Sequence, residues 1–255
     1  MPNKPPPKTG IARSDAQSIH VREMNLVEEL IGKVTFTEMM LLHFYGRMPT
    51  RAEARTLDVV LVTLMEHGIT PSSIATRLIY HSAPDSLQSA VAAGLLGVGS
   101  TYIGTMERCA IYLDEILKGA ERGIERARSI AEMHFRERTP VHGFGHPFHK
   151  PDDPRTQKMI DVALEEGVSG RHIEALRILS HEVDEVYGRH ITINATGASA
   201  ALLGEISIPL KIMRGVAVVS RSAGLVGHIL EESGTPSAPH IWEAVNQAIP
   251  YQRFE

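Results

Sequence analysis

The run Gly143-Phe144-Gly145-His146 and the triplet Asp153-Pro154-Arg155 form the most informative stretch of this sequence. Two glycines before a histidine permit positive φ angles and let a ligand approach the backbone closely. A stiff loop of this kind can present an imidazole as an acid or as an oxyanion donor, although an ordinary tight turn shows the same pattern. Arg155, nine residues after His146, is either a surface arginine behind a helix cap or a guanidinium that grips a carboxylate.

The composition is that of a globular protein without a pronounced charge. The chain has 255 residues, of which 43% are hydrophobic and 22% charged, and its formal net charge is -4. This balance gives no general attraction to nucleic acid, and glycines interrupt the longest apolar runs well short of a bilayer span. Because the single cysteine cannot form an internal disulfide and no apolar leader is visible, we expect a cytoplasmic protein with neither nucleic-acid nor membrane partners.

Apolar residues recur with helical spacing along almost the whole chain. Thr50 and Glu53 form a capping box, and Pro71 occupies a first helical position after Thr70. Only Ile191–Ile193 has the character of a strand, and it is too short for a sheet. We therefore predict an all-α fold of about a dozen helices. The expected helices cover about residues 37–45, 50–68, 71 onward, 86–95, 101–117, 121–137, 154–164, 173–188, 209–219 and a segment after Ser220.

The first residues of the chain are polar and rich in proline. We predict that residues 1–14 form a disordered or partner-bound tail, because they hold too little apolar surface to pack. The loop around His146 and the stretch Pro236–Pro239 are the main expected interruptions between helices.

Together the two opening stretches resemble the citrate synthase superfamily, in which Gly-Phe/Tyr-Gly-His is followed at the same offset by Asp-Pro-Arg. The resemblance covers most of the chain and is strongest to the citryl-CoA lyase branch. It implies that His146 is catalytic and binds the carbonyl oxygen of oxaloacetate or the hydroxyl of citrate. It also implies that Arg155 binds a substrate carboxylate and that Lys150 contacts a phosphate of coenzyme A.

Three further segments carry the resemblance. Leu42–Thr50 is similar to the family's Leu-Leu-x-Gly-x-Leu-Pro-Thr segment. Glu66-His67-Gly68 is similar to the lyase branch's Asp-His-Gly, which implies that His67 binds substrate; a histidine that stabilises a helix C-terminus is the alternative. Ser220–His228 resembles Arg-Ser/Ala-x-Gly-x-x-x-His, which implies that Arg221 grips a second carboxylate. We expect Arg221 to open a helix, so that its side chain and the helix N-terminus face one anion.

Two positions depart from the family pattern. Tyr102 stands where the family's first catalytic histidine lies; the lyase branch has an aromatic residue there, which either donates to the thioester oxygen or simply packs. Thr196 replaces the aspartate that moves the α-proton of acetyl-CoA, and loss of a positioned acid or base typically costs roughly 10²–10⁴-fold in rate. The alternatives are His190 or Glu205 as a substitute base, a water held by Thr196, or a different substrate.

The function that this resemblance implies is cleavage or formation of a carbon–carbon bond between an acyl-CoA and a 2-oxo acid. The substrates would be acetyl-CoA and oxaloacetate, with His146, Thr196 and Tyr102 as catalytic residues. The alternative is a diverged, non-catalytic protein that binds coenzyme A and a dicarboxylate, or an enzyme for another acyl-CoA and acid. The expected ligands are coenzyme A, as acyl-CoA, and a di- or tricarboxylate, and no metal is expected.

The resemblance also implies an assembly. Residues 15–107 with 207–255 would form a large helical domain and residues 108–206 a small one, in a homodimer or a dimer of dimers. The apolar helices around Ala90–Leu96 and Ile208–Val219 are candidates for the interface, with buried core as the alternative. His240–Glu243 resembles the His-Pro-Trp-Asp of the lyase module of ATP-citrate lyase. Pro239 stands where that branch has an arginine, and Arg253 is a candidate replacement.

Overall fold

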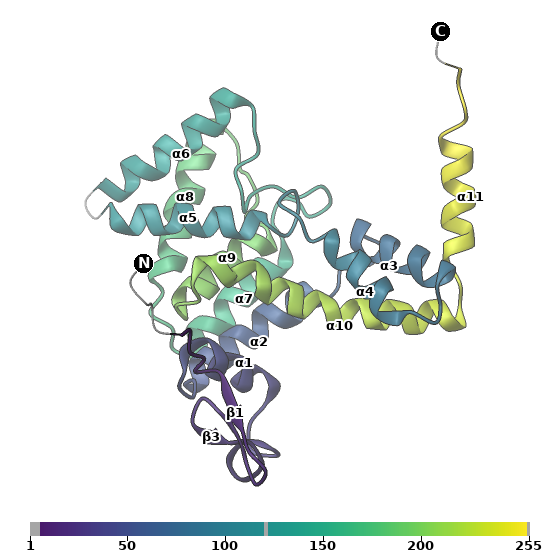
Figure 1. Cartoon of the computed structure of the whole chain (residues 1–255). Helices are drawn as coiled ribbons and strands as arrows, with labels where there is room; N and C mark the ends of the chain where they lie inside the picture. The colour runs from purple at the N-terminus through teal and green to yellow at the C-terminus, as the bar shows by residue number, and fades with distance from the viewer. Residues whose placement is uncertain (1–5, 120–121, 254–255) are drawn as a thin grey trace, which may run out of the picture.

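The computed structural model describes residues 6–119 and 122–253, which form eleven α-helices and a small N-terminal sheet. Figure 1 shows many of the helices gathered around α9, with long α10 leading away from them alongside α3 and α4, and α11 standing at its far end. The prediction of an all-α, multi-helical fold is confirmed. In the described ranges, no helix combines the length and the apolar character needed to cross a membrane.

Three short strands form the N-terminal sheet. The strands are β1 (Ala12–Ser14), β2 (Ile19–Val21) and β3 (Met24–Asn25), and they pair antiparallel in the order β1-β2-β3. The predicted tail is therefore wrong at residues 12–14, which pair with β2, while residues 1–5 lie outside the described part of the chain. Strands of two or three residues are too short to show alternation in the sequence, so periodicity could not find them.

Of the next four helices, the first three begin at capping side chains, whereas Ser86, before the fourth, forms no capping hydrogen bond. They are α1 (Phe36–Tyr45), α2 (Arg51–Met65), α3 (Pro71–Ser82) and α4 (Leu87–Leu96), after a π-helical turn at Leu26–Leu30. The capping box of Thr50 with Glu53 is confirmed, and Pro71 begins α3 as predicted. These caps satisfy backbone N–H groups that a helix cannot pair internally, so they fix where each helix starts.

Helix α9 (Ala195–Glu205) lies at the centre of the molecule (Figure 1). It packs against α2 and against α5 (Thr105–Lys118), α7 (Pro154–Glu165) and α8 (Arg171–Tyr187). All of its residues from Ala198 to Leu203 are buried, which explains its small and apolar sequence. Helix α6 (Gly123–Glu137) covers α5 and α8. The expected start at residue 101 was too early, because α5 begins four residues later, and the expected start at residue 121 lies outside the described residues.

One helix, α10 (Met213–Gly234), replaces the two that were predicted around Ser220. Ser220 is no cap, because its hydroxyl donates to the carbonyl of Leu61 inside the contact with α2. A side chain at Gly224 would collide with the Met65 carbonyl oxygen, so this glycine allows close packing and does not end the helix. The expected loop at residues 236–239 is also partly helical, since α11 (Ala238–Ala248) begins there. The division into two domains stays a prediction.

Candidate active site

The loop around His146 is tied to the segment that leads into α9. Gly143 and Gly145 both have positive φ angles, of 89° and 77°, as the sequence pattern suggested. The N–H of Gly145 donates to Thr192 at 2.7 Å, and the N–H of Asn194 donates to Gly143 at 3.0 Å. The Asn194 side-chain amide also donates to the Gly145 carbonyl at 2.9 Å. The loop is therefore held by backbone hydrogen bonds that need these two glycines.

Close backbone contact locks the same loop against α5 and α9. A Cβ atom on Gly143 would lie 2.6 Å from the sulfur of Cys109. A Cβ atom on Gly197 would lie 2.5 Å from the Gly143 carbonyl oxygen. Neither position tolerates a side chain without movement of the loop or the helix.

Backbone groups fix which nitrogen of His146 carries hydrogen. Its Nδ1 accepts hydrogen bonds from the N–H groups of Phe148, at 3.2 Å, and His149, at 3.0 Å. Nδ1 therefore holds a lone pair, and the neutral ring carries its proton on Nε2. Burial, followed by the neighbouring imidazole of His149, lowers the pKa of His146 below its usual value of 6.5. His146 is therefore a neutral hydrogen-bond donor near neutral pH.

His67, at the end of α2, faces His146. The two ring centroids lie 5.6 Å apart in an edge-on arrangement. The guanidinium Nη1 of Arg155 lies 3.2 Å from Nδ1 of His67 and can only donate, so the neutral His67 ring also presents an Nε2–H. Burial and the charge of Arg155, with a smaller contribution from Arg221, lower the pKa of His67. The structure thus brings His67, His146 and Arg155 together, and Arg221 lies 4.0 Å from the carboxylate of the adjacent Glu66.

Asp153 holds Arg155 in position. Asp153 caps α7, and its two oxygens accept from Nε of Arg155 at 2.9 Å and from Nη2 at 2.7 Å. Asp153 also accepts from the N–H of Ala195 at 3.2 Å, which links α7 to the start of α9. Burial opposes the charge of Asp153, but its bonds with Arg155 hold its pKa below the usual value. Nε and Nη2 of the Arg155 guanidinium are therefore bound by Asp153, and Nη1 points toward His67.

Arg221 is buried with unpaired donors. Its side chain is 6% exposed, and its Nε and Nη1 have no hydrogen-bond partner among the described residues. The nearest carboxylate oxygen, on Glu66, lies 4.0 Å from Nη1. Burial lowers the pKa of Arg221, since little opposing charge offsets the loss of water. The expectation that Arg221 opens a helix was wrong, because it lies in the middle of α10.

Glu66 connects His67 with a buried polar network. It accepts from the N–H groups of His67, at 2.8 Å, and Gly68, at 2.7 Å, and from Nε2 of His228 at 3.1 Å. Burial opposes its charge, but these bonds hold the pKa of Glu66 below its usual value. Nδ1 of His228 in turn accepts from Arg77, at 3.0 Å from Nε. Glu66 and Arg77 were not predicted as site residues, although Glu66 stands in the triplet that pointed to His67.

Three imidazoles meet in this site, which raises the question of a metal. One nitrogen each of His67, His146 and His149 lie within 4.8 Å of one another. Metal ligation needs a lone pair on each nitrogen. His67 and His146 use their Nδ1 lone pairs inside the protein and carry hydrogen on Nε2, so the three rings do not offer a ready set of donors. The absence of a metal remains a prediction.

Thr196 lies in the first turn of α9 and is held by other hydroxyl and amide groups. Its hydroxyl lies 2.7 Å from the Asn194 side-chain oxygen and 2.8 Å from the Thr105 hydroxyl. The Thr105 hydroxyl donates to the backbone carbonyl of Tyr102. Among the described residues, no carboxylate or imidazole forms a hydrogen bond with Thr196, so nothing activates its hydroxyl as a base.

The two proposed substitutes for the missing aspartate do not fit. Glu205 accepts from the N–H groups of Gly170, His172 and Ile173 and lies at the opposite end of α9, about 13 Å along the helix from Thr196. His190 is held between Asp184 and Asp152, at 2.6 Å and 3.1 Å.

Tyr102 does not pack into the site. Its side chain is exposed, and it contributes a backbone carbonyl to the Thr105 hydroxyl. The alternative that Tyr102 is a packed aromatic ring is therefore wrong.

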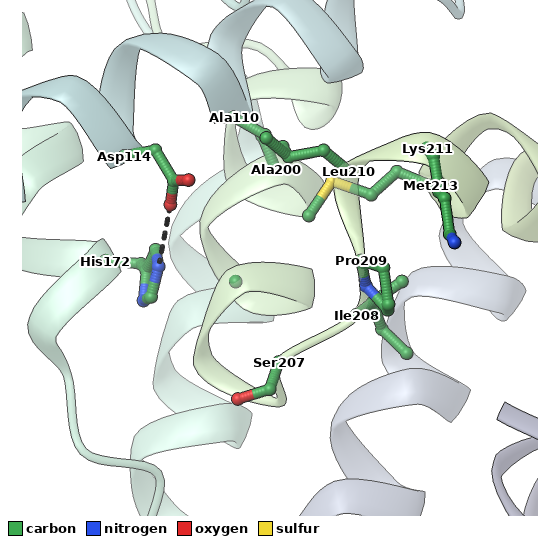
Figure 2. A pocket seen from close by; sticks show the side chains of 11 residues that line it. Ala110, Asp114, His172, Ala200, Ser207, Ile208, Pro209, Leu210, Lys211 and Met213 are labelled. Carbon is green, nitrogen blue, oxygen red and sulfur yellow. Dashed lines mark ion pairs between the residues drawn. The ribbon is translucent and has the colours of Figure 1, made fainter. Parts of the chain in front are cut away.

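Two cavities lie near these elements. One, of about 630 Å³, is lined by His146 and by three cationic side chains, Lys150, Arg138 and Arg189. The structure thus places Lys150 and His146 on one cavity. The other, of about 500 Å³, is lined by residues of α5, α8, α9 and the segment before α10 and contains none of the predicted site residues (Figure 2). There His172 and Asp114 face each other at 3.8 Å.

Comparison with known proteins identifies the family and agrees with the fold. The family model described as "Citrate synthase, C-terminal domain" matches residues 12–238. The chain belongs to the citrate synthase family. The matched segment includes both the loop around His146 and Arg221 on α10.

Solved structures of citrate synthase family members have the same fold. The citryl-CoA lyase from Hydrogenobacter thermophilus superimposes with a TM-score of 0.83 at 28% identity, covering 97% of this chain and 95% of that one. The ATP citrate lyase from Methanothrix soehngenii, in complex with citrate and coenzyme A, gives a TM-score of 0.81 at 18% identity, covering 99% of this chain and 43% of that one. The second likeness shows the fold alone.

Two curated relatives of the chain are longer than it is. "Citrate synthase" from Synechocystis is 25% identical over 218 residues, which cover 83% of this chain and 53% of that protein. "ATP-citrate synthase subunit 1" from Sordaria macrospora is 25% identical over 230 residues, covering 83% of this chain and 33% of that protein. The chain thus spans about half, or a third, of the length of these relatives.

Proposed function

We propose that the chain binds a di- or tricarboxylate between His67, His146 and Arg221 and cleaves or forms a carbon–carbon bond between an acyl-CoA and a 2-oxo acid. Citryl-CoA, which would give acetyl-CoA and oxaloacetate, is the proposed substrate. The observation that carries this proposal is the buried Arg221, whose Nε and Nη1 lack partners beside the Glu66–His67 segment. An unpaired buried cation is costly, and a substrate carboxylate would pair it.

The donors around this position suit an oxygen-rich substrate. In the cleavage direction the tertiary hydroxyl loses its proton and becomes a carbonyl, and the carbon–carbon bonding pair passes to the acetyl carbon as an enolate. The Nε2–H of His146 would hold the reacting oxygen, because a preorganised donor stabilises charge that develops there. Arg221, Nη1 of Arg155 and His67 would hold carboxylates, so the site favours acids that carry several.

Coenzyme A would enter from the cavity beside His146. Lys150, Arg138 and Arg189 line this cavity and give it a positive rim suited to phosphate groups. The same cavity reaches His146, where the thioester end must arrive. We therefore assign the phosphate-bearing part of an acyl-CoA to this rim and keep Lys150 as one of its contacts.

Incubation with citryl-CoA tests the proposal directly. Oxaloacetate release can be followed by its reduction in a coupled assay, and acetyl-CoA release by mass spectrometry. We expect turnover by the natural chain and by His181→Gln, a variant of an exposed histidine away from the site. His146→Gln should lose most of it, because the oxygen would lose its donor. Unchanged rates in His146→Gln would contradict the assignment.

A second candidate function rests on Thr196. Because no carboxylate or imidazole of the described residues forms a hydrogen bond with its hydroxyl, a protein that binds coenzyme A and a carboxylate without turnover is the alternative. Calorimetry with citrate and with coenzyme A distinguishes the two. Binding of both ligands without release of oxaloacetate from citryl-CoA would favour the binding protein.

We also propose that the chain forms a homodimer. Several large apolar side chains of α10 and α11 are exposed, among them Leu230 at 75% and Trp242 at 65%. A second copy would cover these side chains and remove their apolar surface from water. Of the two predicted interface segments, Leu96 is exposed but Ile208 and Val216 are buried in the chain itself. Light scattering tests the proposal, and Trp242→Glu should give a monomer. Location in the cytoplasm stays a prediction.

A further inference from the structure

His149 is the third imidazole of the site, and neither the family pattern nor the proposed function gives it a role. Its ring stacks on that of His146 with centroids 4.3 Å apart and an interplanar angle of 24°. The centroid of His67 lies 6.1 Å away. The stacking on His146 places His149 at the reacting end of the site. Because its side chain is only half-buried, it is still open to a ligand.

The other two imidazoles cannot accept a proton at the nitrogen that faces a substrate. Nδ1 of His146 is used by two backbone N–H groups, and Nδ1 of His67 accepts from Arg155. In both neutral rings the remaining nitrogen, Nε2, already carries hydrogen. These rings can donate to an oxygen, but they have no free lone pair for its proton.

The nearby carboxylates are also occupied. Both oxygens of Asp153 accept from the Arg155 guanidinium, and each also accepts from a backbone N–H group, that of Arg155 or that of Ala195. Glu66 accepts from two backbone N–H groups and from His228. Carboxylates that are satisfied in this way favour the charged form and are weak bases.

His149 differs from all of these groups. In the part of the chain that the structure describes, no hydrogen bond involves either nitrogen of its ring; only its backbone N–H is used, by His146. One of its nitrogens is therefore available as an acceptor, within 4.8 Å of ring nitrogens of His67 and His146. Imidazole is also the side chain best suited to exchanging protons near neutral pH.

We propose that His149 is the general base and acid of the reaction and takes over the proton transfer that Thr196 cannot perform. This proposal rests on the proposed function. In the cleavage direction His149 removes the hydroxyl proton, the oxygen electrons form the carbonyl, the carbon–carbon bond breaks, and the enolate carbon then takes the proton back from His149. Because the hydroxyl oxygen and the departing carbon are bonded to the same carbon, one imidazole can reach both. The proton count balances within one turnover.

The reverse half-reaction isolates this step. In heavy water, a base at the acetyl carbon exchanges the methyl hydrogens of acetyl-CoA for deuterium, which mass spectrometry detects. We expect the natural chain and His181→Gln to show both exchange and citryl-CoA cleavage. His149→Gln should lose both by roughly 10²–10⁴-fold, the usual contribution of a positioned acid or base, with unchanged citrate affinity by calorimetry.

A second variant covers the case in which His149→Gln folds poorly. His149→Ala should regain turnover when free imidazole is added, because the added imidazole can transfer the proton. If the ring of His149 served only for packing, added imidazole would not restore turnover. Full cleavage and exchange in His149→Gln, beside an active natural chain, would overturn the role of His149 and leave the proposed function standing. A parallel loss of citrate affinity would instead make His149 a binding residue. An inactive natural chain would overturn the proposed function and the role together.

Discussion

Two buried arginines lie on neighbouring helices, Arg77 on α3 and Arg221 on α10, and they differ in how the fold pairs their charges. The Arg77 side chain is 3% exposed and contacts Glu231, Glu232 and His228. The Arg221 side chain is 6% exposed, yet its Nε and Nη1 lack partners among the described residues. Burial lowers the pKa of both, but Glu231 and Glu232 reverse the effect at Arg77. A cation that the fold satisfies supports structure, whereas one that it leaves unsatisfied is available to a ligand.

The largest expected effect is on the free energy of unfolding and comes from removing Arg77, the arginine that the fold pairs with carboxylates. Arg77→Met should lower the free energy of unfolding by about 3–5 kcal/mol, because Glu232 would stay buried without its cation. Urea denaturation followed by circular dichroism measures this. Arg126→Met is the control: it breaks an exposed pair with Glu115, and its cost should stay below about 1 kcal/mol. Equal costs would contradict the distinction between the two environments.

Removing the unsatisfied arginine should affect binding and spare stability. We expect Arg221→Met to lose about 2–5 kcal/mol of binding free energy for citrate, because a buried charge pair would be truncated. Its free energy of unfolding without ligand should be unchanged or higher, since the variant no longer buries a cation whose Nε and Nη1 lack hydrogen-bond partners among the described residues. Calorimetry and urea denaturation on the same preparation give both numbers. A destabilised variant with normal citrate affinity would refute the assignment of Arg221.

Citrate itself should stabilise the chain through Arg221. At a hundredfold excess over the dissociation constant, a ligand that binds only the folded state adds about 2.7 kcal/mol. Thermal denaturation with and without citrate should show this gain in the natural chain and in Arg126→Met. Arg221→Met should show little of it at the same concentration. A shift of equal size in all three proteins would place citrate elsewhere.

The smallest expected effect is the dependence of stability on pH. The pKa values of His67 and His146 lie below the usual 6.5, so the unfolded chain binds protons that these folded rings refuse. Stability from these rings is complete above pH 6.5 and falls as the pH drops from there toward their lowered values. Citrate should reduce this loss, because an anion beside the rings favours their protonation. Denaturation at several pH values, with and without citrate, checks the sign.

Much of the fold followed from local signals in the sequence. Capping residues such as Thr50 and Pro71 predicted helix starts because they satisfy groups at the first turn. The continuous α10 could not be predicted around Ser220, since a serine and nearby glycines resemble a helix boundary unless their packing partners on α2 are known. The paired strand at residues 12–14 was missed for the same reason, because its stability comes from its partner strand.

The candidate site was likewise predictable from the sequence only in part. The motif residues His67, His146, Arg155 and Arg221 were named from the sequence, and the structure brings them together around the Glu66–His67 segment. The protonation pattern of the imidazoles was not predictable, because it depends on backbone N–H groups and on an arginine distant in sequence. Likewise, only the structure could show that Glu205 is committed to α8 and cannot replace the missing aspartate.

The two backbone N–H groups that bind His146 also bear on how this loop can change in evolution. Any amino acid except proline supplies an N–H at positions 148 and 149, so the side chains there can be exchanged while His146 keeps its proton on Nε2. Substitutions at these positions can therefore change the role of the side chain at position 149 toward a substrate, while His146 still donates from Nε2. Among all substitutions at Phe148, we expect only proline to change which nitrogen of His146 carries hydrogen, because only proline lacks a backbone N–H.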